Sequence, residues 1–337
     1  MSRTPRGPVL LTGASGFVGA AVMRALLAAG YEVRALVRAP GSFQLLPGVT
    51  TCPGDITDLT STVAAASGCD SVIHCAADYR LSLRPADTAL MIAVNVGGTA
   101  NVLKAAQASG VKRLVHCSTV GTLAFQRTGK VCTEEDRAPS PANLAGPYKR
   151  SKWAAEGLVL GRFAAGLEVV VVQPSTPVGS GDRRPTPTGQ TIRDFLMGRI
   201  PAVVDTGLNL VAVEAVALGH LLALERGQPG RSYILGDRNL TLRQVLSQVA
   251  EIAKVPPPRW RVPLGLAMAA AFSSEAWSRL QDRPPAISLT SVRMAAHPMY
   301  VDSSRAREEL GWDPGDLDEA LRVSVGELGP AKEPRAA

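Results

Sequence analysis

The sequence predicts an α/β fold, a doubly wound parallel sheet with helices on both of its faces. Short runs rich in β-branched residues alternate with Ala- and Leu-rich helical patterns through the first half of the 337-residue chain. A glycine-rich turn joins the first run to the first helical pattern, and the continuous valines within residues 167–174 are typical of a strand buried on both faces. A chain of this length can bury such a core and carry a further part.

The expected elements follow this alternation in order. Strands are expected at 8–12, at 31–37, just before Gly54, and at 71–77, 113–119 and 167–174. Helices are expected at 17–29, 60–67, 95–108 and 148–165. After residue 174 come a Pro- and Thr-rich stretch (183–189), a polar helix (241–253), a proline break (256–258) and a final helix (304–310). Residues 1–174 are therefore expected to form the sheet domain, and residues 175–330 a smaller part with some segments returning to the sheet.

Composition limits the classes of function. The net charge of +7 favours phosphate-bearing partners such as a nucleotide or an anionic membrane, and no nucleic-acid partner is predicted. The five cysteines form no CxxC pair, so we predict neither a zinc site nor a disulfide framework, and we expect a reducing cytoplasm. We also expect no export signal and no transmembrane helix. The four histidines are not spaced in the sequence as metal ligands are, so no metal site is predicted at His74, His116, His220 or His297.

The turn after the first strand carries a dinucleotide-binding pattern. It reads Thr12-Gly13-Ala14-Ser15-Gly16-Phe17-Val18-Gly19, between a predicted strand and a predicted helix. Glycines let the backbone turn tightly and approach a pyrophosphate, whose charge is met by the helix N-terminus. The spacing is GxxGxxG, and a turn that serves only the fold is the alternative interpretation.

Charges near the ends of the next two strands indicate which dinucleotide binds. In an NAD site an acidic residue would follow the second strand, but this sequence has Arg38 there, and Arg34 is expected at the same strand end. Arginine favours a second phosphate, so NADP is predicted over NAD, which stays possible; a solvated arginine is the alternative. Asp55 after the third strand could accept from the adenine amine or could cap the following helix.

A tyrosine and a lysine share one face of the helix expected at 148–165. Tyr148 and Lys152 are four residues apart, which sets a phenol beside an ammonium. A nearby cation lowers the pKa of a phenol, which makes it a usable proton donor and acceptor. Upstream, Ser118 and Thr119 follow a strand at the sheet edge where ligands of open α/β folds bind, although such a hydroxyl can also satisfy a strand-end backbone group.

These motifs together resemble one known family. TGASGFVG, GDITD, HCAA, NVGGT, CSTVGT, YKRSK and YVDSSRAREELGW occur in the order and spacing of the extended short-chain dehydrogenases/reductases, over residues 8 to about 325. AADYRL, PSTPVG, PTPTG and VDTGLNLVAVEAV look like the hopanoid-associated sugar epimerase branch, close to dihydroflavonol reductase-like enzymes. The resemblance implies a Rossmann sheet that binds NADP in residues 1–174, with a mainly substrate-binding part in residues 175–330.

The resemblance also implies roles for individual residues. Tyr148 would be the catalytic acid and base, Lys152 would lower its pKa and bind ribose, and Thr119 would polarise the substrate oxygen, with Ser118 as the neighbouring alternative. The implied cofactor contacts, besides Tyr148 and Lys152, are Gly13, Ser15, Gly16, Phe17, Val18 and Gly19 around the pyrophosphate, Arg38 at the 2′-phosphate, Asp55 and Ile56 at the adenine, Ala76 and Ala77 at the ribose, and Pro174 and Ser175 at the nicotinamide.

The implied reaction is hydride transfer coupled to proton transfer through Tyr148. Dehydration is disfavoured because Thr119 is followed by Val120 and Gly121 where dehydratases of this superfamily have an acidic pair. We expect a reductase acting on a hydroxyl or ketone of a sugar-like or polyol group, in hopanoid lipid biosynthesis. A sugar epimerase without net cofactor turnover is one alternative, and a redox-sensing dinucleotide binder without catalysis is another.

Substrate and partner residues are less distinct. Asp78, Tyr79 and Arg80 directly follow the fourth expected strand, at 71–77. They could contact the substrate or could make only surface contacts. Asn209, with Asp205 nearby, could bind a sugar hydroxyl or only close a turn. The apolar segment 260–272, followed by Trp277 and Arg279, could be a helix lying peripherally on an anionic inner membrane surface, or a helix lining the substrate cleft. A homodimer through the helices at 95–108 and 148–165 is implied by the resemblance.

Overall fold

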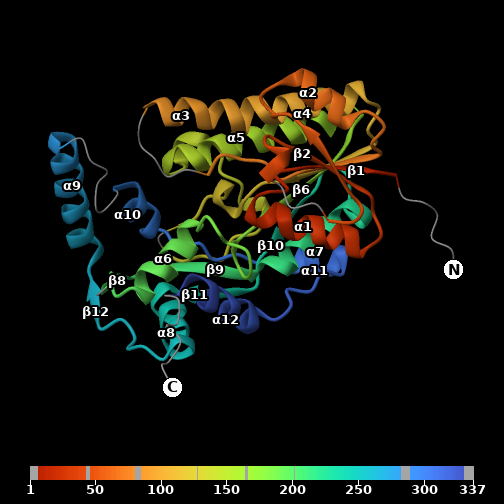
Figure 1. The fold of residues 1–337 in the computed structure, drawn as a ribbon. Coiled ribbons are helices and arrows are strands. Elements are labelled where there is room, and N and C mark those ends of the chain that lie inside the picture. The colour runs from red at the N-terminus through yellow and green to blue at the C-terminus, as the bar shows by residue number, and fades with distance from the viewer. Residues whose placement is uncertain are drawn as a thin grey trace.

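The computed structural model describes residues 7–42, 46–79, 85–126, 128–163, 166–200, 202–281 and 289–329. Within these residues a seven-stranded parallel sheet has the order β10-β6-β5-β4-β1-β2-β3. Helices cover both of its faces, which confirms the predicted fold class (Figure 1). The strands are β1 (Val9–Thr12), β2 (Val33–Val37), β3 (Val49–Pro53), β4 (Ser71–His74), β5 (Arg113–Cys117), β6 (Glu168–Pro174) and β10 (Ser232–Leu235).

Strand β6 lies in the interior of the sheet and carries the run of valines. Val169 to Val172 are all fully buried, because β6 pairs with β5 on one side and β10 on the other and is covered on both faces. One face packs against α1 (Phe17–Ala28), α7 (Val213–Arg226) and α11 (Ser304–Leu310). The other face is covered by α2 (Leu59–Ala66), α4 (Thr99–Ala108) and α5 (Gly146–Phe163).

The helix expected at 95–108 starts earlier than the sequence indicated. It begins as α3 (Pro85–Ile92) and continues through a π-helical turn, η2 (Ala93–Gly98), into α4. The combined stretch Ala86–Ala108 is long and apolar enough to span a membrane by composition, with 44% of its most apolar window buried in the molecule. Its α4 part packs between the sheet, α2 and α5, so the apolar side faces the core.

The second part of the chain contains two small sheets. One has the order β11-β9-β7, from β7 (Thr176–Val178), β9 (Gly207–Ala212) and β11 (Arg238–Thr241). The other pairs β8 (Ala202–Val204) with β12 (Trp260–Val262). The helices here are α6 (Pro187–Leu196), α8 (Leu242–Ala253), α9 (Leu264–Gln281), α10 (Leu289–Ala295) and α12 (Leu317–Leu328), and short 3-10 turns elsewhere are η1 (Pro40–Ser42), η3 (Val120–Thr122), η4 (Glu134–Asp136) and η5 (Pro141–Asn143).

Two segments differ from their expected form. The Pro- and Thr-rich stretch leads into α6, because Thr186 caps the helix by accepting a hydrogen bond from the Gly189 N–H at 3.1 Å and Pro187 occupies its first position. The apolar segment 260–272 does not begin as a helix. Its first residues form β12, and α9 starts only after Pro263, whose missing N–H suits a helix start.

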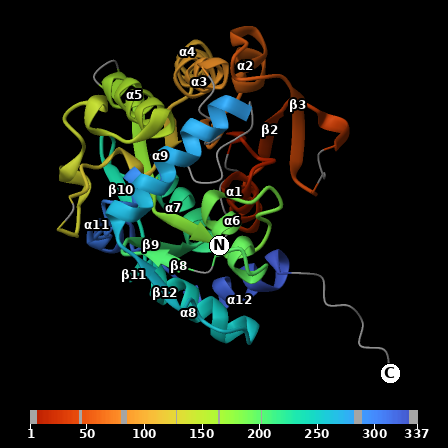
Figure 2. The ribbon, with the colours of Figure 1, turned by 90° about the vertical axis from the view of Figure 1, so that its left-hand side faces the viewer.

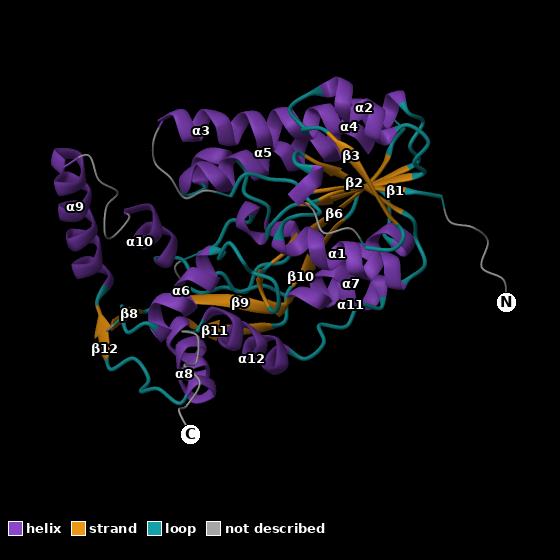
Figure 3. Cartoon of the chain, in the orientation of Figure 1, coloured by secondary structure: helices purple, strands orange, loops and turns teal. Residues whose placement is uncertain are grey.

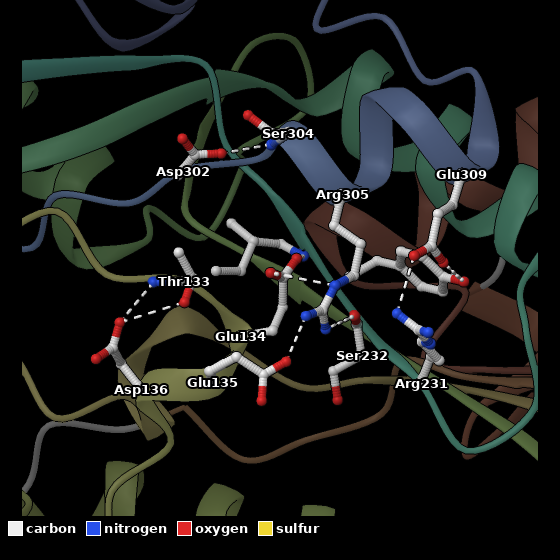
Figure 4. A network of polar contacts seen from close by, with 12 residues as sticks. Thr133, Glu134, Glu135, Asp136, Arg231, Ser232, Asp302, Ser304, Arg305 and Glu309 are labelled. Carbon is white, nitrogen blue, oxygen red and sulfur yellow. Dashed lines mark hydrogen bonds and ion pairs between the residues drawn. The ribbon is translucent and has the colours of Figure 1, made fainter.

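An ion-pair network fastens the returning strand β10 and helix α11 to η4 (Figure 4). Arg305 of α11 lies 3.7 Å from the buried carboxylate of Glu134 and also pairs with Glu135. Glu134 accepts a hydrogen bond from the Ile234 backbone at 2.8 Å, so one carboxylate joins two distant segments. Directly before β10, Arg231 pairs with Glu309 of α11 at 2.9 Å.

Candidate active site

The glycine turn forms a cradle that side chains would fill. Gly13 has a φ of +78°, and a Cβ there would lie 2.6 Å from the backbone nitrogen of Ala76. A Cβ on Gly19 would lie 2.1 Å from the Gly13 carbonyl oxygen. Helix α1 starts at Phe17 and its N-cap, Gly16, provides no side-chain hydrogen bond, so the first N–H groups of the helix are available to an anion. Ser15, Phe17 and Val18 lie in this turn and at this helix start.

The arginines near β2 separate into two roles. Arg38 directly follows the carboxyl end of β2 and its side chain is exposed. Arg34 does not share that position, contrary to the expectation. It lies near the amino end of β2, where its guanidinium donates to the backbone carbonyls of Ala65 (3.1 Å) and Ser67 at the end of α2.

The loop after β3 is ordered around Asp55. Its Oδ1 accepts hydrogen bonds from the backbone N–H and the hydroxyl of Thr57, both at 2.8 Å. The cap of α2 is Asp58 and not Asp55, because Asp58 accepts from the N–H groups of Thr60 and Ser61. Ile56 is buried against Gly98 of η2, where a Cβ would lie 2.5 Å from its Cδ1.

A chain of buried hydrogen bonds starts at the glycine turn and crosses to α4. The Thr12 hydroxyl lies 2.7 Å from His74 Nδ1 and accepts from the Ala76 N–H at 3.2 Å. His74 Nε2 lies 3.0 Å from the Thr99 hydroxyl, which donates to the Asn95 carbonyl at 2.6 Å. Burial, together with the charge of Lys152, lowers the pKa of His74 to about 3, so this ring is neutral at physiological pH.

The Asn95 side chain continues this chain to α5. Its amide Nδ2 donates to the Ser151 hydroxyl at 2.9 Å, and Ser151 in turn donates to the Tyr148 carbonyl at 2.8 Å. The same amide group holds both backbone groups of Asp78, whose N–H donates to Oδ1 and whose carbonyl accepts from Nδ2. A π-helical turn places Asn95 where it can reach both segments.

Tyr148 and Lys152 occupy one face of α5, as the four-residue spacing predicted. The Lys152 side chain is buried and its Nζ donates to the Cys117 carbonyl at the end of β5, at 2.7 Å. The Tyr148 ring meets the Tyr79 ring edge-on, with centroids 4.4 Å apart. Tyr79 is 43% exposed, so this pair of rings lies at the boundary between the interior and solvent.

The pKa of Tyr148 differs from the sequence-based expectation. We expected Lys152 to lower it, but desolvation, Tyr79 and Cys117 raise the pKa of the phenol well above its usual value. The reason is that Lys152 turns toward β5 and is itself desolvated, which lowers the pKa of its ammonium. Tyr148 is therefore a protonated phenol at neutral pH in this structure.

The structure distinguishes the two neighbouring hydroxyls after β5. Ser118 is buried and donates to Glu156 Oε2 at 2.5 Å, so its hydroxyl is committed to the interior. Thr119 is only partly buried, and its Oγ1 accepts from the Gly121 N–H at 3.1 Å, which leaves its proton to be donated. Val120, which follows Thr119, is buried in η3 and carries no acid.

The end of β6 offers an unpartnered hydroxyl. Pro174 ends the strand, and the Ser175 N–H donates to the Leu235 carbonyl at 3.0 Å. The Ser175 Oγ is buried and has no hydrogen-bond partner among the described residues. Ala76 and Ala77 follow β4, on the side where Ala76 packs against Gly13. The glycine cradle, the uncapped helix start and this hydroxyl together fit a dinucleotide.

The predicted substrate residues are not all brought together. Tyr79 contacts Tyr148, and the Asp78 backbone is fixed by Asn95. Arg80 lies outside the described residues. Asn209 is 1% exposed and its amide is used within the protein, because Nδ2 donates to Asn239 at 2.8 Å and Oδ1 accepts from the Asp237 N–H at 2.9 Å. The structure therefore gives Asn209 a place in the fold, joining β9 to β11, and not a place at the site.

Sequence reasoning missed two residues on α5. Glu156 is fully buried, pairs with Arg137 at 2.7 Å and accepts from Ser118, so it anchors the segment that carries Thr119. The signal was its position four residues after Lys152 on the same helix face. Lys149 lies 3.4 Å from Met299 Sδ, and burial lowers its pKa to about 8, but no pattern in the sequence marked it.

A comparison with family sequence profiles decides the identity. The profile of the NAD dependent epimerase/dehydratase family matches residues 9–236, which is more than half of the chain. The chain belongs to this family. It is an NAD(P)-dependent oxidoreductase of the extended short-chain dehydrogenase/reductase type, as the motifs predicted.

Similar proteins cover nearly the whole chain. A Synechocystis protein provisionally assigned as a dihydroflavonol 4-reductase is 40% identical over 322 residues, 94% of this chain and 92% of its own. Sterol demethylase protein B of Methylococcus capsulatus is 34% identical over 320 residues, 94% of this chain and 96% of its own. The crystal structure of gox2253 is 38% identical, with a TM-score of 0.83, covering 96% of this chain and 97% of that one.

The buried His74 predicts that stability falls in acid. The folded state keeps His74 neutral down to a pKa of about 3, whereas in the unfolded chain a histidine takes up a proton near pH 6.5. Stability from His74 is therefore present above pH 6.5 and is lost as the pH falls. Between pH 7 and pH 5 we expect a loss of about 2 kcal/mol from this residue, measured by urea unfolding of the cofactor-free protein.

The His74→Asn variant should show a smaller difference between the two pH values, by about this amount. His297→Asn is the control. Equal pH dependence in both variants would contradict the assignment of His74 as a buried neutral histidine.

Proposed function

We propose that this protein is an NADP(H)-dependent reductase that interconverts a ketone and a hydroxyl on a sugar-like or polyol group attached to an apolar, polycyclic lipid, hopanoids among them. The observation that carries the proposal is that Thr119 keeps a hydroxyl proton free while Ser118 gives its own to Glu156. The turn η3, directly after Thr119, packs against α5, the helix that carries Tyr148. The named relationship to a sterol demethylase protein supports a lipid substrate.

In this proposal each residue has a distinct task. The bound nicotinamide supplies or accepts the hydride. Thr119 donates a hydrogen bond to the substrate oxygen, and Tyr148 gives its phenolic proton to that oxygen as the ketone is reduced. Because the pKa of Tyr148 is raised, its phenol is in the protonated form that reduction needs at neutral pH. Lys152, held by the Cys117 carbonyl, places a positive charge on the same helix face and is proposed to bind the ribose.

The cofactor contacts are proposed from the cradle outward. The residues of the glycine turn and helix start hold the pyrophosphate, and the exposed Arg38 meets the 2′-phosphate. Asp55 keeps one carboxylate oxygen on Thr57, and with Ile56 it borders the adenine position. The orphan Ser175 hydroxyl, beside Pro174, is proposed to bind the nicotinamide carboxamide, and Ala76 and Ala77 to line the ribose.

A sugar epimerase is the second candidate, because the family name includes that reaction. An epimerase returns its hydride to the substrate and shows no net change in cofactor, whereas a reductase consumes one NADPH for each ketone reduced. The third candidate, a dinucleotide binder without turnover, is disfavoured because the chain has both Tyr148 and Lys152 on α5.

Replacing Tyr148 by Phe should remove turnover and spare cofactor binding. The substitution deletes the proton donor but keeps the ring contact with Tyr79. With candidate ketones, followed at the NADPH absorbance, we expect the rate to fall by at least 100-fold and the Kd for NADPH to change by less than about threefold, in line with the usual contribution of a general acid.

Tyr31→Phe is the matched control, because its hydroxyl contacts Glu225 of α7 at the protein surface and lies outside the site. Full activity in Tyr148→Phe would contradict the catalytic assignment. Product formed by the unmodified protein without NADPH consumption would favour the epimerase.

Arg38 should determine the preference for NADP. Arg38→Asp replaces a cation that can pair with the 2′-phosphate by an acid that repels it, so affinity for NADP should fall at least tenfold while that for NAD rises or holds. Fluorescence titration with both dinucleotides measures this. Arg24→Asp on exposed α1 surface makes the same charge change and should alter neither affinity. Tighter binding of NAD than NADP by the unmodified protein would contradict the proposal.

The proposed oligomer is a homodimer formed through α3, α4 and α5. Leu90 and Ile92 on α3 and Leu158 on α5 are between 40% and 49% exposed. Apolar side chains of this size on neighbouring helices support a contact between two copies through this face.

A cytoplasmic protein that touches the inner membrane surface is proposed from α9. This helix stands away from the body of the molecule (Figures 1 and 3), and in Figure 2 it lies across the front. Ala267 and Ala271 pack toward Val292 of α10. On the other side, Leu266 and Trp277 are 65% and 63% exposed, with Ala270 and Ser273 between them on the same face.

The charges around α9 support a lipid surface as its partner. Residues 264–274 contain no charged side chain, which is unusual for a helix open to water. At the start of the segment, Trp260 is 70% exposed between the exposed Arg259 and Arg261, the latter 3.8 Å from Asp205. Tryptophan and arginine beside an apolar face are typical of helices that lie in a membrane interface.

Vesicle flotation tests this contact. With vesicles containing an anionic lipid, part of the protein should float, and adding salt or replacing Leu266 and Trp277 together by Glu should release it. Val131→Glu is the control, because it places the same charge at an exposed apolar position that is far from α9 in the sequence. Protein that remains entirely in the soluble fraction would contradict the proposal, and a change of mass in the double variant without vesicles would instead assign α9 to a contact between two copies.

A further inference from the structure

Three side chains that the proposed reaction does not use gather at the carboxyl end of the sheet. Cys75 follows β4, Cys117 ends β5, and His220 projects from α7, which covers that face. One ligand atom from each lies within 4.8 Å of the others. The register His74↔His116 places the next residues, Cys75 and Cys117, side by side on neighbouring strands. Three residues far apart in the sequence thus form one cluster in the fold.

His220 is oriented so that one ring nitrogen is free. Its Nδ1 lies 2.8 Å from the Val216 carbonyl, and because a carbonyl only accepts, Nδ1 carries the proton. In the neutral ring with its proton on Nδ1, the other nitrogen, Nε2, has the lone pair. It is fully buried and has no hydrogen-bond partner in the part of the chain that the structure describes. Histidines that bind metals are held in the same way, with the second nitrogen donating to a carbonyl.

The two thiols are suited to act as ligands. Both cysteines are free and partly exposed. Cysteine sulfur binds a metal ion as a thiolate, and the register of β4 and β5 sets the two sulfurs side by side at this site.

We propose that Cys75, Cys117 and His220 form a binding site for one thiophilic divalent metal ion, with Zn²⁺ as its representative. Zn–S bonds of about 2.3 Å and Zn–N bonds of about 2.0 Å set neighbouring ligand atoms about 3.5 to 3.8 Å apart in a tetrahedron. The ligand atoms are already within 4.8 Å, so small side-chain rotations close the site.

The charge balance of this site is favourable. Each thiol that is still protonated releases its proton to solvent as its sulfur binds the cation, and no electron is transferred. Two thiolates cancel the two charges of the ion, which leaves a neutral site beside the Lys152 ammonium on the Cys117 carbonyl. Three protein ligands leave a fourth position open, as in zinc sites that bind a water molecule or another ligand.

Metal titration of the reduced, metal-free, full-length protein tests the proposal. Co²⁺ should bind with a stoichiometry of one and produce a thiolate-to-cobalt charge-transfer band, and Zn²⁺ should displace it. Cys75→Ser, Cys117→Ser and His220→Asn should each weaken binding at least tenfold. Cys132→Ser is the matched control, because it removes a buried thiol from a different part of the core and should leave binding unchanged.

Alkylation mapped by mass spectrometry keeps the test decisive if a variant does not fold. In the unmodified protein, Zn²⁺ should protect Cys75 and Cys117 and leave the labelling of Cys52 unaltered. Absence of the band, a band that survives Cys75→Ser, or equal labelling with and without Zn²⁺ would overturn the proposal. NADPH binding by the metal-free protein is measured alongside, so that failure of the metal site and failure of the proposed reductase function are told apart.

Discussion

The buried hydrogen-bond chain from Thr12 to Ser151 is the constraint on which the site depends. It links the glycine turn to α4 through His74 and Thr99, and reaches α5 through the Asn95 amide. Because these groups are shut off from water, loss of one partner leaves a neighbour unsatisfied, at a cost of roughly 1–3 kcal/mol. The chain therefore fixes how the dinucleotide cradle and the tyrosine-bearing helix sit relative to each other.

The polar side chains near the ends of β5 and β6 are of two kinds: some are hydrogen-bonded within the protein, and others keep a free hydroxyl group. Glu156 is buried and holds Arg137 and Ser118, so the segment behind the site is rigid. Thr119 and Ser175 differ from this pair. The Thr119 hydroxyl accepts a hydrogen bond but donates none to the described residues, and the Ser175 hydroxyl has no partner among them. In the proposed reaction the Thr119 hydroxyl meets the substrate oxygen, and the Ser175 hydroxyl meets the nicotinamide carboxamide.

Local patterns predicted the sheet, the glycine cradle and the Tyr148–Lys152 face, since each depends on short periodicities and on residues close in sequence. They did not show that Asn209 is buried between β9 and β11, that Lys152 turns to the Cys117 carbonyl, or that Arg34 serves the end of α2. Those outcomes depend on contacts between segments far apart in the chain. The cysteine and histidine cluster was hidden for the same reason.

We propose that the Tyr148 phenol and the Thr119 hydroxyl face the reactive end of the cofactor. The most direct measurement is a crystal structure of the protein with bound NADP. We expect the pyrophosphate on the first N–H groups of α1, the nicotinamide carboxamide on the Ser175 hydroxyl, and the nicotinamide ring beside the Tyr148 hydroxyl. A ring directed away from Tyr148, or a dinucleotide bound elsewhere on the molecule, would contradict it.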